Sequence, residues 1–358
     1  MKQMFESLSD LAARLQADAR SQQDVLAPAA HISMDPLAAL SIGGAATMPV
    51  SDLGHDQLAD YTNIPRAYYE RLRDGSKDLL AVNVNHWLRN KGSERRMVRT
   101  RDGVVRALLS DRYQRIDNHE VAEVALDALR SVPGFRVVSC AVTEQRLYIK
   151  AVSEAVQQQV TGSRRTGDVV EAGVMVSNSE VGLGSVSIQP FAHFLVCTNG
   201  MVRNKEGLRA AHVGRRLDTA VEGLLSEGTK RLEDEVVLRK VQDVIRHAFD
   251  KVAFRRFIDQ LEASVQQPIA GDVTGAVESL GPTLGLTSGE RQSVLRHLIE
   301  GGDLSRYGLM NAVTRTAHDV PSYDRATELE AAGFRVVELQ PREWQAISQA
   351  RPLAAATA

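Results

Sequence analysis

The sequence predicts an α+β protein in which a central, mostly antiparallel sheet domain with an inserted helix is flanked by N-terminal helices and a long C-terminal helical region. Three observations predict this class. Apolar residues recur at helical spacing near both ends of the chain, they form short strand-like runs between residues 95 and 200, and turn residues separate those runs. The 358 residues are 43% apolar and 25% charged, as in ordinary globular proteins.

This length allows two or three compact units. The patterns divide the chain into an N-terminal helical region (1–94), a central β-rich domain (95–216), a C-terminal helical region (217–345) and a flexible tail (346–358).

The N-terminal region is expected to be helical. Residues 3–20 place apolar side chains three and four positions apart, which indicates an amphipathic helix, and a loop rich in Ala, Ser and Gly follows. Two short helices are expected within 51–72, where Pro65 suits a first helical position, and another at 79–90.

In the central region, the turn pair Asp102-Gly103 between apolar runs predicts a hairpin. Residues 118–130 form the inserted helix, because their apolar spacing is helical and Asp117 or Asn118 can cap it. Further strands are expected at 135–142, 146–151, 169–177, 184–188 and 192–198.

Near-helical spacing continues through residues 217–261, which predicts one long helix or two helices broken near Gly228. A loop at 268–275 and helices at 288–299 and 309–318 follow.

Composition limits the function. The net charge of −2 gives no whole-chain basic excess, so any nucleic-acid binding must rest on local patches. No apolar run approaches the about 20 residues of a membrane helix and no signal peptide is seen, so we expect a cytoplasmic protein without membrane contact. Cys140 and Cys197 lack zinc-site spacing, no two histidines have the spacing of a helical metal pair, and no cofactor or metal is expected.

Two segments are rich in basic residues. Segment 89–115 is dominated by arginines, which suit planar contacts to phosphates, although a solvated edge hairpin explains the same residues. Segment 203–216 precedes the long helix, where positive charge opposes the helix dipole and so has no stabilising role. A groove between the two segments is the preferred anion-binding surface.

Two other segments carry alternatives. The glycines and hydroxyls of Ser177–Ser185 could present backbone amides to an anion, or simply form tight turns, and the P-loop spacing is absent. A metal-dependent nuclease could be built on Asp111, Asp117, His119 and Glu120, but helix capping explains Asp117 and Glu120 as well.

The motifs LLSDRY, SNSEVGLGSVSIQPF, LVCTNGMV, HVGR and GLMNAVTRTAHD occur in this order between residues 95 and 335. They resemble the phage- and plasmid-like proteins grouped as domain of unknown function 932. The resemblance implies residence on mobile elements, and by analogy of fold the region is compatible with ring-forming single-strand annealing proteins.

The leading hypothesis is a non-enzymatic protein of a mobile element that binds single-stranded DNA and assists annealing, recombination or protection, as a homo-oligomer. Its expected contact residues are Arg95, Arg96, Arg99, Arg101, Arg112, Tyr113, Arg203, Lys205, Arg209, Arg215 and Arg216. The alternatives are the nuclease above and an oligomeric counter-defence or interaction protein, in which the long helix packs between subunits.

Overall fold

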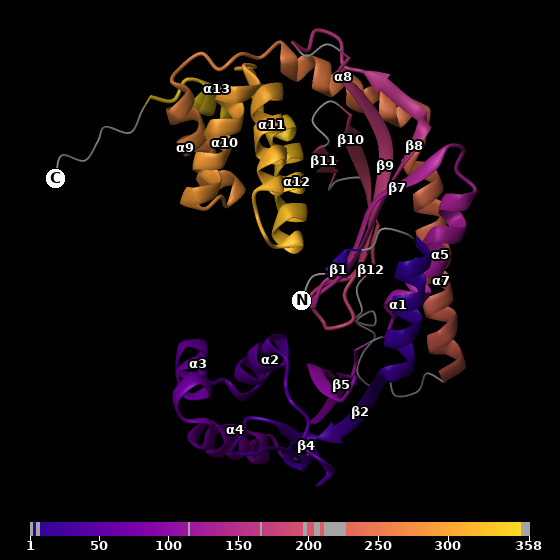
Figure 1. Cartoon of the computed structure of the whole chain (residues 1–358), viewed down its shortest axis with the longest axis vertical. Helices are drawn as coiled ribbons and strands as arrows, with labels where there is room; N and C mark the ends of the chain where they lie inside the picture. Colours follow the sequence, from indigo (N-terminus) through magenta and orange to yellow (C-terminus); the bar gives the residue numbers. More distant parts are fainter. Residues whose placement is uncertain are drawn as a thin grey trace, which may run out of the picture.

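The computed structural model describes residues 3–4, 8–113, 115–164, 167–195, 199–203, 208–210 and 227–351. Its centre is a single antiparallel sheet in the order β1-β7-β8-β9-β10-β11, with β12 also paired to β10 (Figure 1). The strands are β1 (Gln3–Met4), β7 (Phe135–Val142), β8 (Leu147–Gln159), β9 (Val169–Asn178), β10 (Val186–Phe194), β11 (Asn199–Val202) and β12 (Leu208–Ala210).

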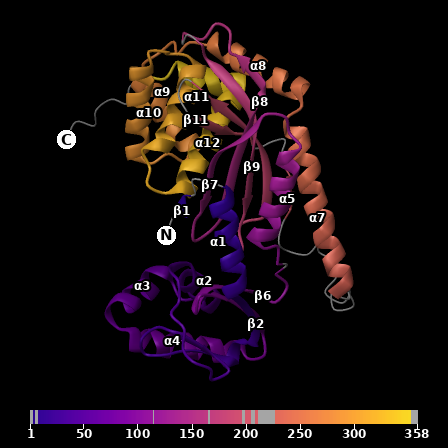
Figure 2. The same cartoon turned by 45° about the vertical axis from the view of Figure 1, so that its right-hand side comes forward.

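The two faces of this sheet differ because successive side chains of a strand point to opposite sides. One face is apolar: Ile149, Val174 and Ile188 of three neighbouring strands lie in the main hydrophobic core. Figure 2 shows helices α1 (Leu8–Ser21), α5 (Asn118–Arg130) and α7 (Glu227–Ala248) on this side. The other face mixes polar and apolar residues, and α12 (Tyr323–Glu338) lies near it.

A separate N-terminal lobe has its own core, which includes Leu58, Tyr69 and Leu80. Its strands β2 (Gln22–Pro28), β5 (Arg95–Arg101) and β6 (Val104–Ser110) form a three-stranded sheet. Around it lie η1 (Ala29–His31), the pair β3 (Ile32–Met34) and β4 (Leu40–Ile42), and helices α2 (Asp52–Thr62), α3 (Arg66–Gly75) and α4 (Lys77–Lys91).

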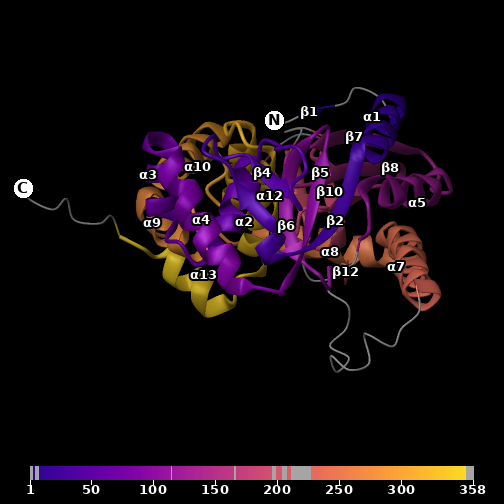
Figure 3. The ribbon, with the colours of Figure 1, turned by 90° about the horizontal axis from the view of Figure 1, so that it is seen from below.

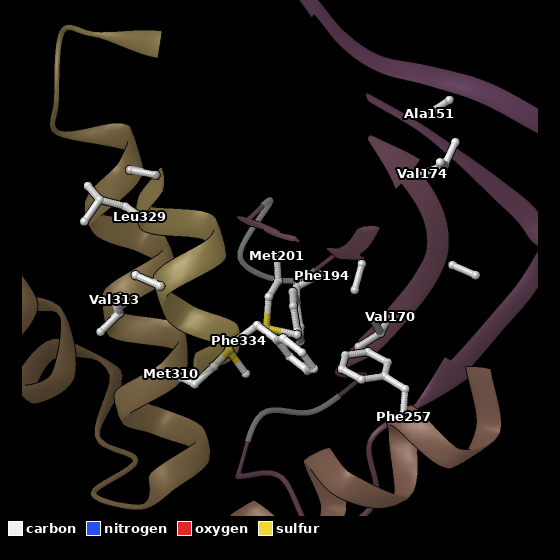
Figure 4. Close-up of a cluster of buried hydrophobic side chains, with 14 of the residues drawn as sticks. Ala151, Val170, Val174, Phe194, Met201, Phe257, Met310, Val313, Leu329 and Phe334 are labelled. Atoms are coloured by element: carbon white, nitrogen blue, oxygen red, sulfur yellow. The ribbon is translucent and has the colours of Figure 1, made fainter. Parts of the chain in front are cut away.

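The C-terminal helices extend the main core. Phe194 and Met201 of the sheet meet Phe257, Met310 and Phe334 of three helices (Figure 4). The elements are α8 (Lys251–Val265), α9 (Val273–Leu284), α10 (Ser288–Gly301), α11 (Arg306–Arg315), η2 (Thr316–His318), α12 and α13 (Pro341–Ser348). Seen from below, α9, α10 and α13 lie on the same side of the molecule as α3 and α4, with α7 on the opposite side (Figure 3).

The predicted α+β class, antiparallel sheet and flanking helices are confirmed, as are the Asp102-Gly103 hairpin and the inserted helix α5. That hairpin, however, pairs with β2 in the N-terminal lobe and not with the central sheet. The predicted domain boundaries and the similarity to annealing proteins stay predictions. Within the described ranges, no helix is long and apolar enough to cross a membrane.

Three local expectations were wrong. The stretch after α1 is a loop only in part, since it contains β2, β3 and β4. The two strands expected on either side of Pro190 are one strand, β10, because Pro190 lies where its missing N–H is not needed and its carbonyl accepts from Arg203 N. The described part of the expected long helix is α7, which begins at Glu227, and the chain breaks before Asp250, whose side chain caps α8. Residues 217–226 lie outside the described residues.

Candidate nucleic-acid interface

Arg99 lies inside the protein and not at its surface. Its side chain is fully buried, and its guanidinium donates to Asp24 Oδ1 at 2.8 Å, Asp117 Oδ1 at 2.8 Å and the Glu180 carbonyl at 3.1 Å. Burial alone would lower the pKa of Arg99, but the hydrogen bond to Asp24 and the charge of Asp117 outweigh it and raise the pKa. In this arrangement the Arg99 charge is paired with the half-buried carboxylates of Asp24 and Asp117.

A second buried pair continues this network. Glu180 accepts from Arg106 at 3.1 Å through one carboxylate oxygen, and from the Asn118 backbone N–H at 2.8 Å through the other. We call Asp24, Arg99, Arg106, Asp117 and Glu180 the junction, since together they connect β2, β5, β6, the start of α5 and the β9–β10 loop.

Two more of the expected contact residues also point inward. Arg101 donates to Asp18 Oδ2 at 2.7 Å, and burial, together with nearby Arg106, lowers the pKa of its guanidinium. Arg203 is buried with its guanidinium 4.6 Å from the centre of the Phe257 ring. Neither side chain is placed to meet a phosphate at the surface in this conformation.

The acidic segment proposed for a nuclease supplies a helix cap. Asp117 and Glu120 form a capping box at the start of α5, in which the Asp117 N–H donates to Glu120 Oε2 at 3.0 Å. Asp111 is exposed and His119 half-buried. In the described part of the chain, no group of three or more His, Cys, Asp or Glu residues could hold a metal ion. The nuclease stays a prediction without a site.

Two expected contact residues come together at an open hollow of about 690 Å³, which we call the first hollow. Arg96 and Tyr113 line it, with Tyr61 of α2 and Lys91 at the end of α4. The Arg96 guanidinium lies 4.0 Å from the Tyr61 ring centre, and Lys91 Nζ lies 5.1 Å from it. Both cations therefore gather over one aromatic ring.

Tyr113 is held at its hydroxyl, which donates to the Ser179 carbonyl at 2.8 Å, and burial raises its pKa. The chain neighbours of these lining residues, Arg95 and Arg112, are exposed. Sequence reasoning missed Tyr61, because a single tyrosine in an amphipathic helix gives no signal beyond helix packing.

The remaining expected residues belong to the segment before α7. Lys205, Arg215 and Arg216 lie outside the described residues, and so does much of the groove expected between that segment and the hairpin. Arg209 is on β12, where it is the register partner of Ser187.

The mixed face of the central sheet carries a second hollow of about 630 Å³. Its floor includes Tyr148, Met175, Ser177, Ser187 and Gln189 of three adjacent strands. Helix α12 forms one wall. Gly184 and Ser185 of the β9–β10 loop line both hollows, so the two adjoin.

Ion pairs and hydrogen bonds attach α12 to this face. Tyr148 donates from its hydroxyl to Asp324 Oδ1 at 2.7 Å, and Lys150 Nζ donates to Glu330 Oε2 at 2.5 Å. Burial and the bond to Asp324 raise the pKa of Tyr148. A sequence signal for the face existed, because Ser177, Ser187 and Gln189 interrupt apolar strands at alternate positions.

The model of the family Domain of unknown function (DUF932) matches residues 106–332. Neither a search of curated proteins nor a search of solved structures finds a match. The matched segment runs from β6 into α12, and it contains every lining residue of the second hollow except Arg335. Tyr61, Lys91 and Arg96 of the first hollow lie before it.

Proposed function

The chain belongs to the family Domain of unknown function (DUF932), and we propose that it is a mobile-element protein that binds single-stranded DNA and assists its annealing, recombination or protection. One observation carries the proposal: Arg96 and Tyr113, both singled out from the sequence, line one hollow with a further cation and a further aromatic ring. Cations placed beside ring faces are the combination that single-stranded nucleic acid requires.

A single strand is preferred over a duplex as the ligand because its bases are unpaired. Such a base exposes both ring faces and its hydrogen-bonding edge, while its phosphate stays within reach of neighbouring cations. The first hollow supplies Lys91 and Arg96 for the phosphate, where Arg96 exchanges its ion pair with the exposed Glu94 for the ligand, and the exposed Arg95 and Arg112 extend the charge along the chain.

The charge is local, so the dependence on salt should be moderate. If Lys91, Arg95, Arg96 and Arg112 each replace one counterion, the slope of log K against log salt should be about −3 for a single strand. The measurement is fluorescence anisotropy of a labelled single-stranded oligonucleotide titrated with the full chain at several salt concentrations. Absence of salt-sensitive binding at low ionic strength would overturn the proposal.

Variants locate the contact. Replacing Lys91 and Arg96 together with Ala should weaken binding about tenfold at 0.1 M salt and make the slope shallower, because two counterions fewer are released. The matched control is Arg239→Ala on α7, where the side chain is 74% exposed and pairs with Glu235. Equal loss in the control and the double variant would contradict a contact at the first hollow.

An oligomeric counter-defence or interaction protein is the second candidate, supported by apolar side chains on the outside of α7. Leu232 is 63% exposed and Val236, one turn later, is 50% exposed. A helix that packed between subunits would bury this stripe. Light scattering of the full chain tests it, and Leu232→Glu should shift any oligomer toward the monomer.

A further inference from the structure

The polar residues of the mixed face form a row across the central sheet. Tyr148, Ser177 and Ser187 are register partners on β8, β9 and β10. Residues directly opposite one another in antiparallel strands share a face. The second hollow lies over this row, with Gln189 two residues further along β10.

Two hydroxyls in the second hollow lack a hydrogen-bond partner. Ser187 is 6% and Thr327 7% exposed, both line the hollow, and among the described residues neither side-chain oxygen has a partner. We call them the open hydroxyls. Burying a hydroxyl without a partner costs about 1–3 kcal/mol, so such groups call for an explanation, and a ligand that supplies the missing bonds is one.

The charges around the hollow favour an anion. Arg325 is neutralised by Glu290 and Glu328, to which it donates at 2.7 Å each. Arg146 and Arg335 also line the hollow, but they donate to the carbonyl oxygens of Leu183 and Leu284, and no ion pair with a carboxylate joins them in the described ranges. Their charge is therefore available to a ligand.

Among the lining residues, three arginines (Arg146, Arg325 and Arg335) lie with two carboxylates (Asp324 and Glu328), so the lining has an excess of one positive charge. Asp324 accepts from Tyr148 and Thr143, and Glu328 is engaged by Arg325. The floor beneath is partly apolar and includes the aromatic ring of Tyr148 and the side chain of Met175. A ligand that matches this lining has a flat ring, a polar edge and a negative group.

We propose that the second hollow binds one nucleotide unit, with its base against the sheet, its polar edge at Gln189 and the open hydroxyls, and its phosphate at one of two lining arginines, Arg146 or Arg335. The hollow has a volume within the range of small-ligand sites. Two sources share this chemistry: a nucleotide of the bound strand, which rests on the proposed function, and a free mononucleotide, which does not.

The position of the second hollow suits a strand of nucleic acid. Both hollows include Gly184 and Ser185, so a chain of nucleotides that occupies the first hollow can reach the second by crossing one loop. The β9–β10 loop is the border between them, and it is fixed by Gln57, which donates to the Val181 carbonyl at 2.8 Å.

The test uses the full chain, a single-stranded 12-mer and each deoxynucleoside monophosphate in calorimetric titrations. The variants are Ser187→Ala and Thr327→Val, singly and combined, which remove the open hydroxyls and nothing else. The control is Ser139→Ala, on β7, whose hydroxyl bonds to Tyr323 at 2.7 Å outside the hollow. The double variant should weaken binding about tenfold, and the control should leave it unchanged.

The outcomes separate the two proposals. Oligonucleotide binding that is sensitive to the double variant supports a strand nucleotide, and monophosphate binding with the same sensitivity supports a free one. Oligonucleotide binding that depends on Lys91 and Arg96 but not on the open hydroxyls, with no monophosphate bound, overturns the second hollow and leaves the proposed function standing. Monophosphate binding without oligonucleotide binding overturns the proposed function and leaves the second hollow standing. No binding of either probe overturns both.

If a variant does not fold, as judged by circular dichroism and melting, competition on the unmodified protein still decides. Monophosphate that displaces the 12-mer shares its site, which supports the second hollow. An excess of monophosphate that displaces none of the 12-mer and releases no heat of its own, with oligonucleotide bound only through Lys91 and Arg96, counts against it.

Discussion

The junction and the second hollow both contain buried polar groups, yet the two regions differ in how these groups are paired. In the junction, Arg99 has Asp24 and Asp117 as partners, and Glu180 uses both carboxylate oxygens. In the second hollow, the open hydroxyls have no partner among the described residues. Adjacent parts of one loop, 179–185, contribute to both regions.

The difference separates structure from binding. Charged groups that pair with one another within the chain connect the N-terminal lobe to the central sheet, and each charge is neutralised by its partner. A buried polar group without a hydrogen-bond partner lowers stability. A ligand that supplies the missing hydrogen bond is one reason for such a group to be retained. Charge in the sequence alone therefore does not tell which arginines are exposed, since Arg99 is fully buried and paired with Asp24 and Asp117.

The largest expected effect is at the junction. Arg99→Leu should lower the free energy of unfolding by about 3–5 kcal/mol, because it leaves Asp24 and Asp117 without their buried partner. Chemical denaturation followed by circular dichroism measures it. Arg95→Ala, at an exposed position of the same strand, should change stability by less than about 0.5 kcal/mol. Similar losses in both variants would show that the junction is not specially stabilising.

Sequence reasoning succeeded where a local rule was sufficient. Asp117 and Glu120 predict a capping box from their spacing alone, and α5 begins there as expected. Local rules failed where a contact between residues far apart in the sequence decides the secondary structure. Strand β2 is polar and irregular by itself, and it becomes a strand because β5, about 75 residues later, pairs with it. The break before Asp250 has a local signal that sequence reasoning missed, because the Asp250 side chain accepts from the Ala253 N–H at 2.8 Å and caps α8.

The candidate site was predictable only in part, for the same reason. Arg96 and Tyr113 were found because they belong to one basic segment. Ser187 and Thr327 are 140 positions apart and chemically ordinary, so no sequence pattern joins them. Whether an arginine meets water or a buried aspartate depends on chain segments that meet only in the fold.

An intermediate effect is expected at the wall of the second hollow. The hydrogen bond from Arg325 lowers the pKa of Glu290 to about 2, from 4.5. Because the folded pKa is the lower one, this contribution is complete above pH 4.5 and is lost as the pH falls toward 2. We expect this ion pair to contribute about 1–2 kcal/mol to the free energy of unfolding. This is less than the full pKa shift implies, because Arg325 is partly exposed.

Melting temperatures between pH 2 and pH 6 check this prediction. Glu290→Gln should lower stability at pH 6 and flatten the decline below pH 4.5, since the amide does not titrate. An unchanged acid profile in Glu290→Gln would mean that the ion pair between α10 and α12 contributes nothing to the stability of this wall.

The smallest effect tests the comparison most directly, because one chemical change should have different results in two places. Ser139→Ala removes a hydroxyl bonded to Tyr323 and should cost about 1 kcal/mol without ligand. Ser187→Ala removes an open hydroxyl from the same face and should cost nothing or stabilise slightly, because a buried group without a partner is lost. Differential scanning calorimetry of both variants without ligand measures this. A loss of stability at Ser187 as large as that at Ser139 would show that the Ser187 hydroxyl already has a partner in the free protein. Thr327 would then be the one remaining open hydroxyl of the second hollow among the described residues.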